Sequence, residues 1–178
     1  DGYNDYVEVP SIDLSGTDVV SASLWFKPDY QENNGAVLEF SANFNDSVTG
    51  FGFFADPVSD VCEGYLGIGL KGDAGYNFSC FERPSINEWH HILMICDKGE
   101  ALNEVVLYVD GELSNRALHP HTNDNTNNFG NNPLYMMSRG GASIFENGQI
   151  DEVKIWNYAL TAEQIKSEYS GGAVRFGE

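Results

Sequence analysis

Three loops of this sequence are dense in side-chain oxygen atoms, the ligands that hard cations such as calcium prefer. The residues concerned are Asn45 and Asp46, Asp56 and Asp60, and Asp124 and Asn125. Asn and Asp also favour turn geometry for its own sake, so each loop could be only a polar turn. We expect at least one of the three loops to bind a ligand.

Two tyrosines near these loops could supply flat aromatic surfaces on which a ligand ring stacks. Tyr65 shares one strand face with Gly67 and Gly69, whose missing side chains would leave a groove above the sheet. Tyr76 lies close by in the sequence. The alternative is that the aromatic residues are simply core, which suits Trp25 better than Tyr76 because the terminal helix could cover Trp25.

Asp151 is predicted to point toward the apolar interior, because Val153 and Ile155 share its parity in the last strand. A buried carboxylate needs a cation or hydrogen-bond donors to offset the loss of water. Calcium would satisfy it, since this ion is bound by oxygen ligands. The alternative is that Asp151 only accepts backbone hydrogen bonds where the strand bends.

The sequence contains no recognisable catalytic pattern. Neither the E-x-D-x-E nor the E-x-D-x-x-E arrangement of paired carboxylates occurs, and no G-x-S-x-G nucleophile elbow is present. The adjacent His90 and His91 would point to opposite faces of a strand, so they could not share one metal ion without distortion. We therefore expect a protein that is not an enzyme.

The elements that must position these residues are short strands, because nearly every segment alternates apolar and polar side chains and ends in a turn. The predicted strands are 6–9, 20–27, 36–40, 50–55, 65–70, 76–81, 89–96, 104–109, 112–118, 134–138 and 149–156. Asp110-Gly111 predicts a tight hairpin. Thr161 and Gln164 form a capping box that starts one helix, and Gly171-Gly172 ends it. The pattern predicts an all-β, two-sheet antiparallel jelly-roll sandwich with one short C-terminal helix.

The charge of the chain limits its partners. The 9 Lys and Arg residues face 27 Asp and Glu residues, which gives a net charge of −18. Such a surface repels nucleic acids and anionic membranes, and no apolar run is long enough to span a bilayer. We expect no nucleic acid partner and no membrane insertion. Because Asp1 begins abruptly in what reads as a strand, we expect residues 1–178 to form a single domain that is a module of a longer polypeptide.

The three cysteines leave two possibilities open. Cys62 and Cys80 flank a predicted hairpin that turns at 71–75, so they could face each other and form a disulfide. Three free thiols is the alternative. Cys96 ends an apolar strand and is expected to be a small buried hydrophobic residue.

The segment Gly148-Gln149-Ile150-Asp151-Glu152-Val153-Lys154-Ile155-Trp156-Asn157-Tyr158-Ala159-Leu160-Thr161-Ala162-Glu163-Gln164-Ile165 resembles the closing strand and helix of laminin-G-like jelly-roll domains, which belong to the concanavalin A-like lectin/glucanase superfamily. Three further pieces agree in order: Asp1-Gly2 with Asn4-Asp5-Tyr6-Val7, then Trp25-Phe26-Lys27-Pro28, then Trp89-His90-His91 leading to Leu107-Tyr108-Val109-Asp110-Gly111. These pieces specify a fold more closely than a function, because one fold hosts many activities.

The resemblance implies a carbohydrate-recognition module, secreted or at the cell surface, that calcium supports. It also implies a structural calcium ion held by Asp1 or Gly2, Gly35 and Asp151. The expected partner is a glycan, either neutral or anionic and bridged by calcium. The alternatives are a protein-recognition or spacer domain of an extracellular adhesin and, less favoured, a glycoside hydrolase of the same fold.

Overall fold

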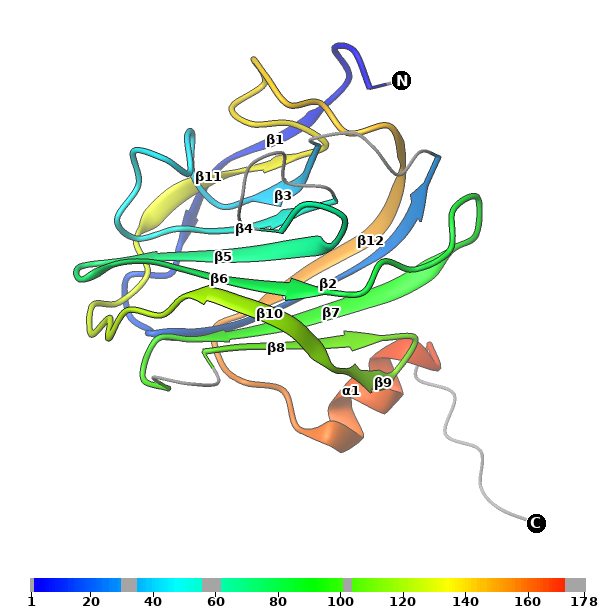
Figure 1. The fold of residues 1–178 in the computed structure, drawn as a ribbon. Coiled ribbons are helices and arrows are strands. Elements are labelled where there is room, and N and C mark those ends of the chain that lie inside the picture. The colour runs from blue at the N-terminus through cyan, green and yellow to red at the C-terminus, as the bar shows by residue number, and fades with distance from the viewer. Residues whose placement is uncertain (1, 30–34, 56–61, 101–103, 172–178) are drawn as a thin grey trace.

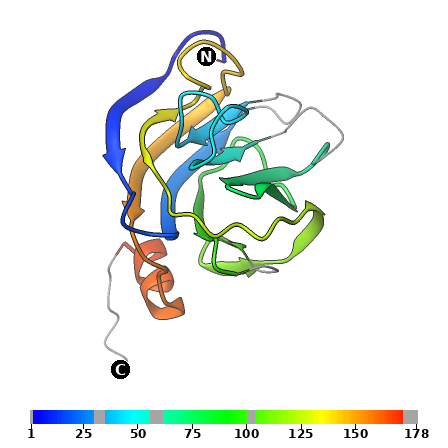
Figure 2. The same ribbon diagram turned by 90° about the vertical axis from the view of Figure 1, so that its left-hand side faces the viewer.

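The computed structural model describes residues 2–29, 35–55, 62–100 and 104–171, which form two antiparallel sheets packed face to face (Figure 1, Figure 2). The seven-stranded sheet contains, in spatial order, β1 (Val7–Asp13), β11 (Asn131–Met136), β3 (Ala36–Glu39), β4 (Phe51–Phe54), β5 (Leu66–Gly72), β6 (Gly75–Phe81) and β10 (Arg116–His121). The five-stranded sheet contains β12 (Gly148–Trp156), β2 (Val19–Pro28), β7 (His90–Asp97), β8 (Val105–Val109) and β9 (Glu112–Ser114). The predicted all-β sandwich is confirmed.

The main core lies between the two sheets and follows the predicted alternation. Ala22, Leu24 and Phe26 of β2 point inward and are almost completely buried. Across the interface, the Phe26 ring meets the Phe53 ring of β4 edge to face, with 6.0 Å between the ring centroids. Burial of apolar surface on the facing sides of both sheets is the main stabilising contribution.

The predicted strand 112–118 is two strands that belong to different sheets. β9 pairs with β8 in the five-stranded sheet, whereas β10 pairs with β6 in the seven-stranded sheet. The chain therefore changes sheet at Asn115. Strands that turn from one sheet into the other form the corners of such sandwiches, and alternation alone gives no sign of the change.

A second apolar layer covers the outer face of the seven-stranded sheet. Its members are Ala36, Phe44, Phe54, Cys62, Phe78 and Cys80, with Tyr65 and Tyr76 packed against them. A side chain at Gly69 would collide with the rings of Phe44 and Phe78. The predicted groove beside Tyr65 is therefore wrong at Gly69, because aromatic rings fill the space that this glycine leaves.

A disulfide joins Cys62 to Cys80, and their Cα atoms lie 5.4 Å apart. Of the two possibilities that the sequence leaves open, the paired state is the one found. Cys96 is free and buried, as expected.

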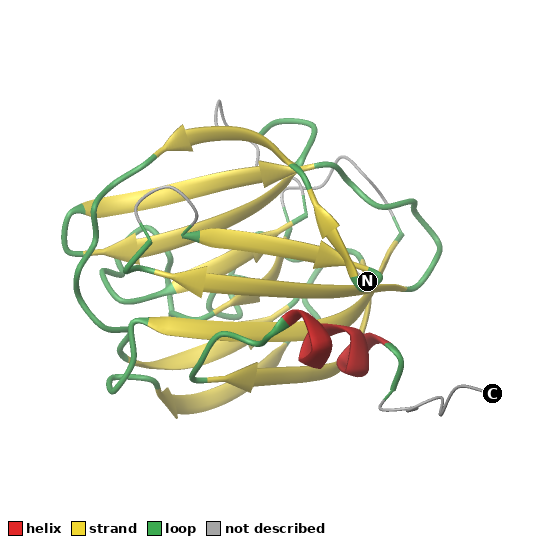
Figure 3. Cartoon of the chain, turned by 90° about the horizontal axis from the view of Figure 1, so that it is seen from below, coloured by secondary structure: helices red, strands yellow, loops and turns green. Residues whose placement is uncertain are grey.

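The only helix among the described residues, α1 (Ala162–Tyr169), lies against the outside of the five-stranded sheet (Figure 3). Its capping box is complete, since the Thr161 side chain accepts from the Gln164 backbone and the Gln164 side chain accepts from Thr161. Leu160 and Ile165 pack onto Leu93 of β7. Within the described residues no helix is long and apolar enough to cross a membrane.

Trp25 lies beneath this helix. Its ring centroid lies 5.3 Å from that of His91 and 6.0 Å from that of Tyr169, at the end of α1. The interpretation of Trp25 as a residue covered by the terminal helix is confirmed. His90 points the other way, toward Asp110, so the two adjacent histidines do face opposite sides of the sheet.

Candidate functional site

Several loops meet at one end of the sandwich, on the left in Figure 1. They are the loop 41–49 after β3, the β5–β6 turn, and the segment 122–130 between β10 and β11, here called the Asn-rich strap. Asn127 Nδ2 of the strap donates to the Val48 carbonyl at 2.9 Å. Asp73 of the β5–β6 turn accepts from the backbone N–H and the hydroxyl of Thr126, both at 2.8 Å. Two of the three predicted oxygen-rich loops therefore lie side by side.

A row of three partly exposed side chains crosses the outer sheet face at this end. Lys71 of β5 is the cross-strand partner of Tyr76 in β6, and His121 of β10 follows on the far side. The Tyr76 hydroxyl lies 2.9 Å from His121 Nε2, and the two ring centroids are 4.3 Å apart. Lys71 Nζ lies 5.3 Å from the Tyr76 ring centroid. The row combines aromatic surface with hydrogen-bonding groups.

The loop 41–49 brings Asn45 and Asp46 to this row. Lys71 Nζ donates to the Asn45 carbonyl at 3.1 Å. Burial lowers the pKa of Lys71, while the nearby Asp46 carboxylate acts in the opposite direction. Both Asn45 and Asp46 are exposed, and Asn43 Nδ2 orients the Asp46 carboxylate at 2.6 Å. The structure thus places three predicted residues, Asn45, Asp46 and Tyr76, around one lysine.

A buried carboxylate holds the base of this loop. Glu39 Oε1 accepts from the backbone N–H of Phe44 at 2.6 Å, and Arg139 Nε donates to Glu39 Oε2 at 2.9 Å. Burial raises the pKa of Glu39, and the Arg139 guanidinium partly offsets that effect. Because the ion pair fixes the backbone at Phe44, it also fixes the direction in which Asn45 and Asp46 extend.

The other predicted ligand-binding residues are not part of the row. Asn125 is buried, and its Oδ1 accepts from the backbone N–H of Ala74 at 2.9 Å. It occupies the space above Gly72, where a side chain would collide with it. The expected ligand contact of Asn125 is therefore corrected to a structural role. Asp124 is exposed on the strap, Tyr65 is half-buried near the disulfide, and Asp56 and Asp60 lie outside the described residues.

Sequence reasoning missed Lys71 and His121. The pairing of Lys71 with Tyr76 follows from the turn at 71–75, so a register argument would have placed Lys71 opposite Tyr76. His121 could not be found in this way. It reaches Tyr76 only because β10 crosses into the seven-stranded sheet, and the sequence carries no signal for that change.

The expected inward orientation of Asp151 is wrong. Its side chain is exposed, while Ile150 and Val153 both pack against the core. The register of β12 on β2 shifts between Asp151 and Lys154, and Glu152 has a positive φ of 47°. This bulge inserts an additional residue and reverses the parity on which the prediction depended.

Gly2 and Gly35, which were predicted to bind calcium, both lie against the segment 146–147. A side chain at Gly35 would collide with the Glu146 carboxylate, and one at Gly2 would come within 2.8 Å of Asn147 Cβ. The buried carboxylate at this place is therefore Glu146 and not Asp151. Asp1 lies outside the described residues, within which no three His, Cys, Asp or Glu side chains are grouped to hold a metal ion. The calcium ion stays a prediction.

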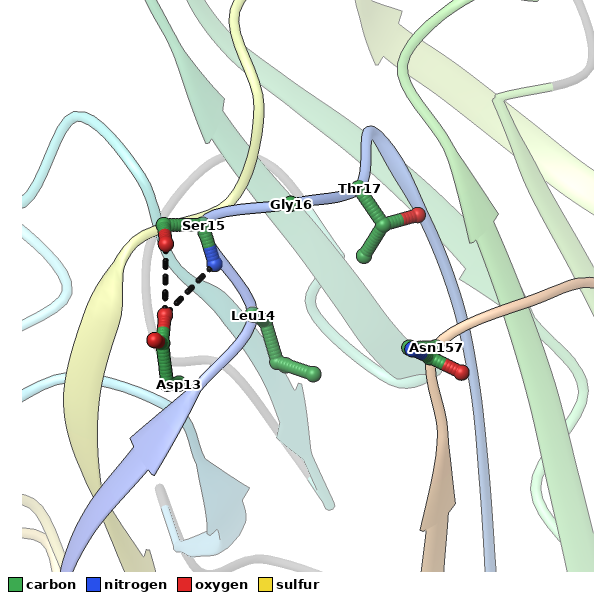
Figure 4. A pocket seen from close by; sticks show the side chains of 6 residues that line it. All are labelled: Asp13, Leu14, Ser15, Gly16, Thr17 and Asn157. Carbon is green, nitrogen blue, oxygen red and sulfur yellow. Dashed lines mark hydrogen bonds between the residues drawn. The ribbon is translucent and has the colours of Figure 1, made fainter.

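A polar hollow of about 320 Å³ lies near the other end of the strap (Figure 4). The β1–β2 turn, residues 13–17, forms one wall, and Asn157 faces it from the segment after β12. Hydrogen bonds from the Ser15 hydroxyl and backbone N–H lower the pKa of Asp13. The strap is fastened to this turn, since Asn128 Nδ2 donates to the Ser15 carbonyl at 2.8 Å.

Comparison with solved structures supports the fold and extends over most of the chain. Domain 4 of AbnA, a GH43 extracellular arabinanase from Geobacillus stearothermophilus solved in complex with arabinotriose, has a TM-score of 0.61 and 18% identity, with 91% of this chain and 71% of that chain covered. The heptameric SAP-like pentraxin of Limulus polyphemus has a TM-score of 0.61 and 16% identity, with 94% and 75% covered. The botulinum neurotoxin serotype G binding domain has a TM-score of 0.65 and 16% identity; this chain is covered to 94% but spans only 40% of that one.

At this level of identity the likeness shows the fold alone. No curated protein matches the sequence significantly. The laminin-G family model described as "Concanavalin A-like lectin/glucanases superfamily" matches residues 1–166. The chain therefore belongs to the laminin-G family of the concanavalin A-like lectin/glucanase superfamily.

Proposed function

We propose that this protein is a non-catalytic carbohydrate-binding module whose ligand contacts Lys71, Tyr76 and His121. The observation that carries the proposal is the row together with the adjacent Asn45 and Asp46. Aromatic surface, the Lys71 ammonium group and exposed oxygen acceptors lie there within one small area. Lys71 donates to sugar hydroxyls, Asp46 accepts from them, and the apolar faces of sugar rings pack against aromatic side chains.

The chemistry of the row favours a neutral glycan. Lys71 offers donors and Asp46 offers an acceptor, so neighbouring hydroxyl groups of one sugar can engage both. An anionic sugar would meet the Asp46 carboxylate in a protein whose net charge is already −18. Anionic glycans would require a bridging calcium ion.

The proposed setting is extracellular. A disulfide between Cys62 and Cys80 persists in oxidising compartments. Among the proteins of similar fold, the arabinanase is described as extracellular, and its domain was solved with a bound oligosaccharide. We further propose that a calcium ion supports the fold beside Gly2 and Gly35, where the Glu146 carboxylate supplies hard oxygen ligands.

The test is a glycan array followed by titration calorimetry with arabinotriose and with the strongest ligands of the array. We expect Lys71→Ala and Tyr76→Ala each to weaken binding at least about tenfold, the equivalent of about 1.4 kcal/mol. Tyr158→Ala, which removes an exposed tyrosine outside the row, is the matched control and should bind as the wild type does.

Each measurement is repeated in calcium and in EDTA. Binding that survives EDTA while the melting temperature falls assigns calcium to the fold. Binding lost in EDTA with an unchanged melting temperature assigns calcium to the ligand. Absence of binding to any glycan in either buffer would contradict the carbohydrate proposal and favour a protein-recognition domain.

A further inference from the structure

A hydrogen-bonded network of four polar side chains lies at the end of the sandwich opposite the loop-rich end, on the right in Figure 1. It joins the loop 82–89, between β6 and β7, to the tight β8–β9 turn. Ser85 Oγ lies 2.5 Å from Glu88 Oε2 and 3.0 Å from His90 Nε2. His90 Nδ1 lies 2.8 Å from Asp110 Oδ2.

Asp110, the turn residue of this hydrogen-bonded network, is held firmly. Asp110 Oδ1 accepts from the backbone N–H of His91, and the Asp110 N–H donates to the His91 carbonyl, both at 2.8 Å. Asp110 therefore has little freedom to turn away. On the loop side the contacts are made by Ser85 and Glu88, and the loop is also held to β2 at Asn87, whose backbone N–H donates to the Pro28 carbonyl at 2.8 Å.

The three contacts need three hydrogen atoms. The carboxylates of Glu88 and Asp110 only accept, the Ser85 hydroxyl supplies one hydrogen, and a neutral imidazole at His90 supplies one more. With a neutral histidine, one of the three contacts lacks a hydrogen. An imidazole is a stronger base than a carboxylate, so the third proton resides on His90.

We propose that this hydrogen-bonded network of Ser85, Glu88, His90 and Asp110 is a proton-operated latch. With both ring nitrogens protonated, His90 holds the loop 82–89 against the β8–β9 turn. Loss of one proton breaks the hydrogen bond between His90 and Ser85 and releases the loop from the β8–β9 turn, while the hydrogen bond between Asn87 and Pro28 remains. The loop carries the exposed Ile86 and Trp89. Proton concentration thus sets how firmly this end of the sandwich is closed.

Two carboxylates are linked to His90 by the hydrogen bonds of the latch: Asp110 of the turn directly, and Glu88 of the loop through Ser85. On β2, the cross-strand partner of His90 is the apolar Phe26. The other charged residues on the elements that meet here are Lys27 on β2, Glu82 and Arg83 in the loop, and Glu112 on β9.

The order Ser85, His90, Asp110 is also that of a hydrolase triad, but the hydrogen bonds run in the opposite direction. A general base must offer an unprotonated Nε2 to the serine hydroxyl. Here the Ser85 hydroxyl donates to Glu88 at 2.5 Å, so His90 is the donor to Ser85. The arrangement fastens a loop and does not activate a nucleophile.

The decisive variant is Glu88→Gln. A glutamine amide donates to Ser85 Oγ, which leaves the Ser85 hydroxyl free to donate to a neutral His90. All three contacts then form without the third proton. We expect NMR spectra recorded across a pH series to show the amide resonances of Ile86 and Asn87 changing together with the His90 ring signals in the wild type. In Glu88→Gln the two amide resonances should stay constant.

Glu82→Gln is the matched control, because it removes the same charge from the same loop without touching the latch. In this variant the amide resonances of Ile86 and Asn87 should change with pH as they do in the wild type. The same pH response of the loop resonances in Glu88→Gln and Glu82→Gln, or loop resonances that do not follow the His90 ring signals in the wild type, would overturn the proposal. Ser85→Ala provides a second check, since it removes the link and should also separate the loop from the titration.

Discussion

Lys98 is an unusual residue in this molecule, because it is a lysine with only 3% of its surface exposed. Its Nζ lies 4.4 Å from the centroid of the Phe129 ring and donates to Asn127 Oδ1 at 3.3 Å and to the Asn128 carbonyl at 3.4 Å. Burial lowers the pKa of Lys98 to about 8, although the Asp73 charge acts in the opposite direction. Lys98 therefore fastens the Asn-rich strap but carries a desolvated charge.

This lowered pKa predicts a stability that rises with pH. Between about 8 and the ordinary lysine value of 10.5, the folded protein binds fewer protons at Lys98 than the unfolded chain does. Raising the pH through this window should therefore stabilise the fold. Lys98→Met should be more stable than the wild type at pH 7, by about 1–3 kcal/mol, and this advantage should shrink by pH 9.5.

Urea unfolding of both proteins at pH 7 and pH 9.5 checks this prediction, because the other titrating groups are common to the two chains. A less stable Lys98→Met at pH 7 would mean that the contacts with Phe129 and the strap outweigh the cost of burying the charge.

The residues of the candidate site could be predicted where their positions depend only on residues nearby in the sequence. Asn45 and Asp46 form a turn, and Tyr76 follows a hairpin turn, so composition and spacing identified them. Glu146 could not be found, because it lies beside Gly35 only after β12 has packed against β2. Asp151 was misplaced because a bulge depends on backbone conformation, which alternation of residue types does not encode.

The elements themselves were largely predictable. Period-two alternation identified the strands, and Asp110-Gly111 produced the tight β8–β9 turn with φ of 52° and 79°. The sequence pattern does not show which strands distant in sequence pair with one another. For this reason β9 and β10 were expected to be one strand. The chain ends β9 in one sheet and begins β10 in the other because of long-range packing between strands.

A disulfide links Cys62, in the segment between β4 and β5, to Cys80 of β6 and helps to cover the outer sheet face. The two cysteines are 18 residues apart, and a crosslink over a loop of this length stabilises by about 3 kcal/mol through the unfolded state. We expect the double variant Cys62→Ala, Cys80→Ala to lose about that free energy of unfolding in urea. Dithiothreitol should destabilise the wild type and leave the double variant unchanged, and equal stability of both oxidised proteins would contradict the prediction.

For the whole molecule, charge is the dominant surface property. The net charge of −18 makes the folded chain repel itself, and salt screens that repulsion. Near the β7–β8 turn, burial raises the pKa of Asp97, and the neighbouring charges of Asp18 and Glu100 add to the effect. The melting temperature should therefore rise with sodium chloride at pH 7.

Asp18→Asn should raise the melting temperature in low salt and reduce the gain that salt provides. Glu163→Gln, which removes one charge at the start of α1, is the comparison that separates local repulsion from total charge. An identical response of the two variants would assign the effect to total charge and would contradict a role for the Asp18, Asp97 and Glu100 group.

The strand order determines when the chain can acquire its structure. β1 pairs with β11 and β2 pairs with β12, so each sheet needs a strand from the final third of the sequence. A growing polypeptide cannot complete either layer until almost all of it has been synthesised, and such long-range pairing is slow. Neither sheet can therefore be completed before β11 and β12 have been synthesised, so we expect the sandwich to close late in the synthesis of the chain.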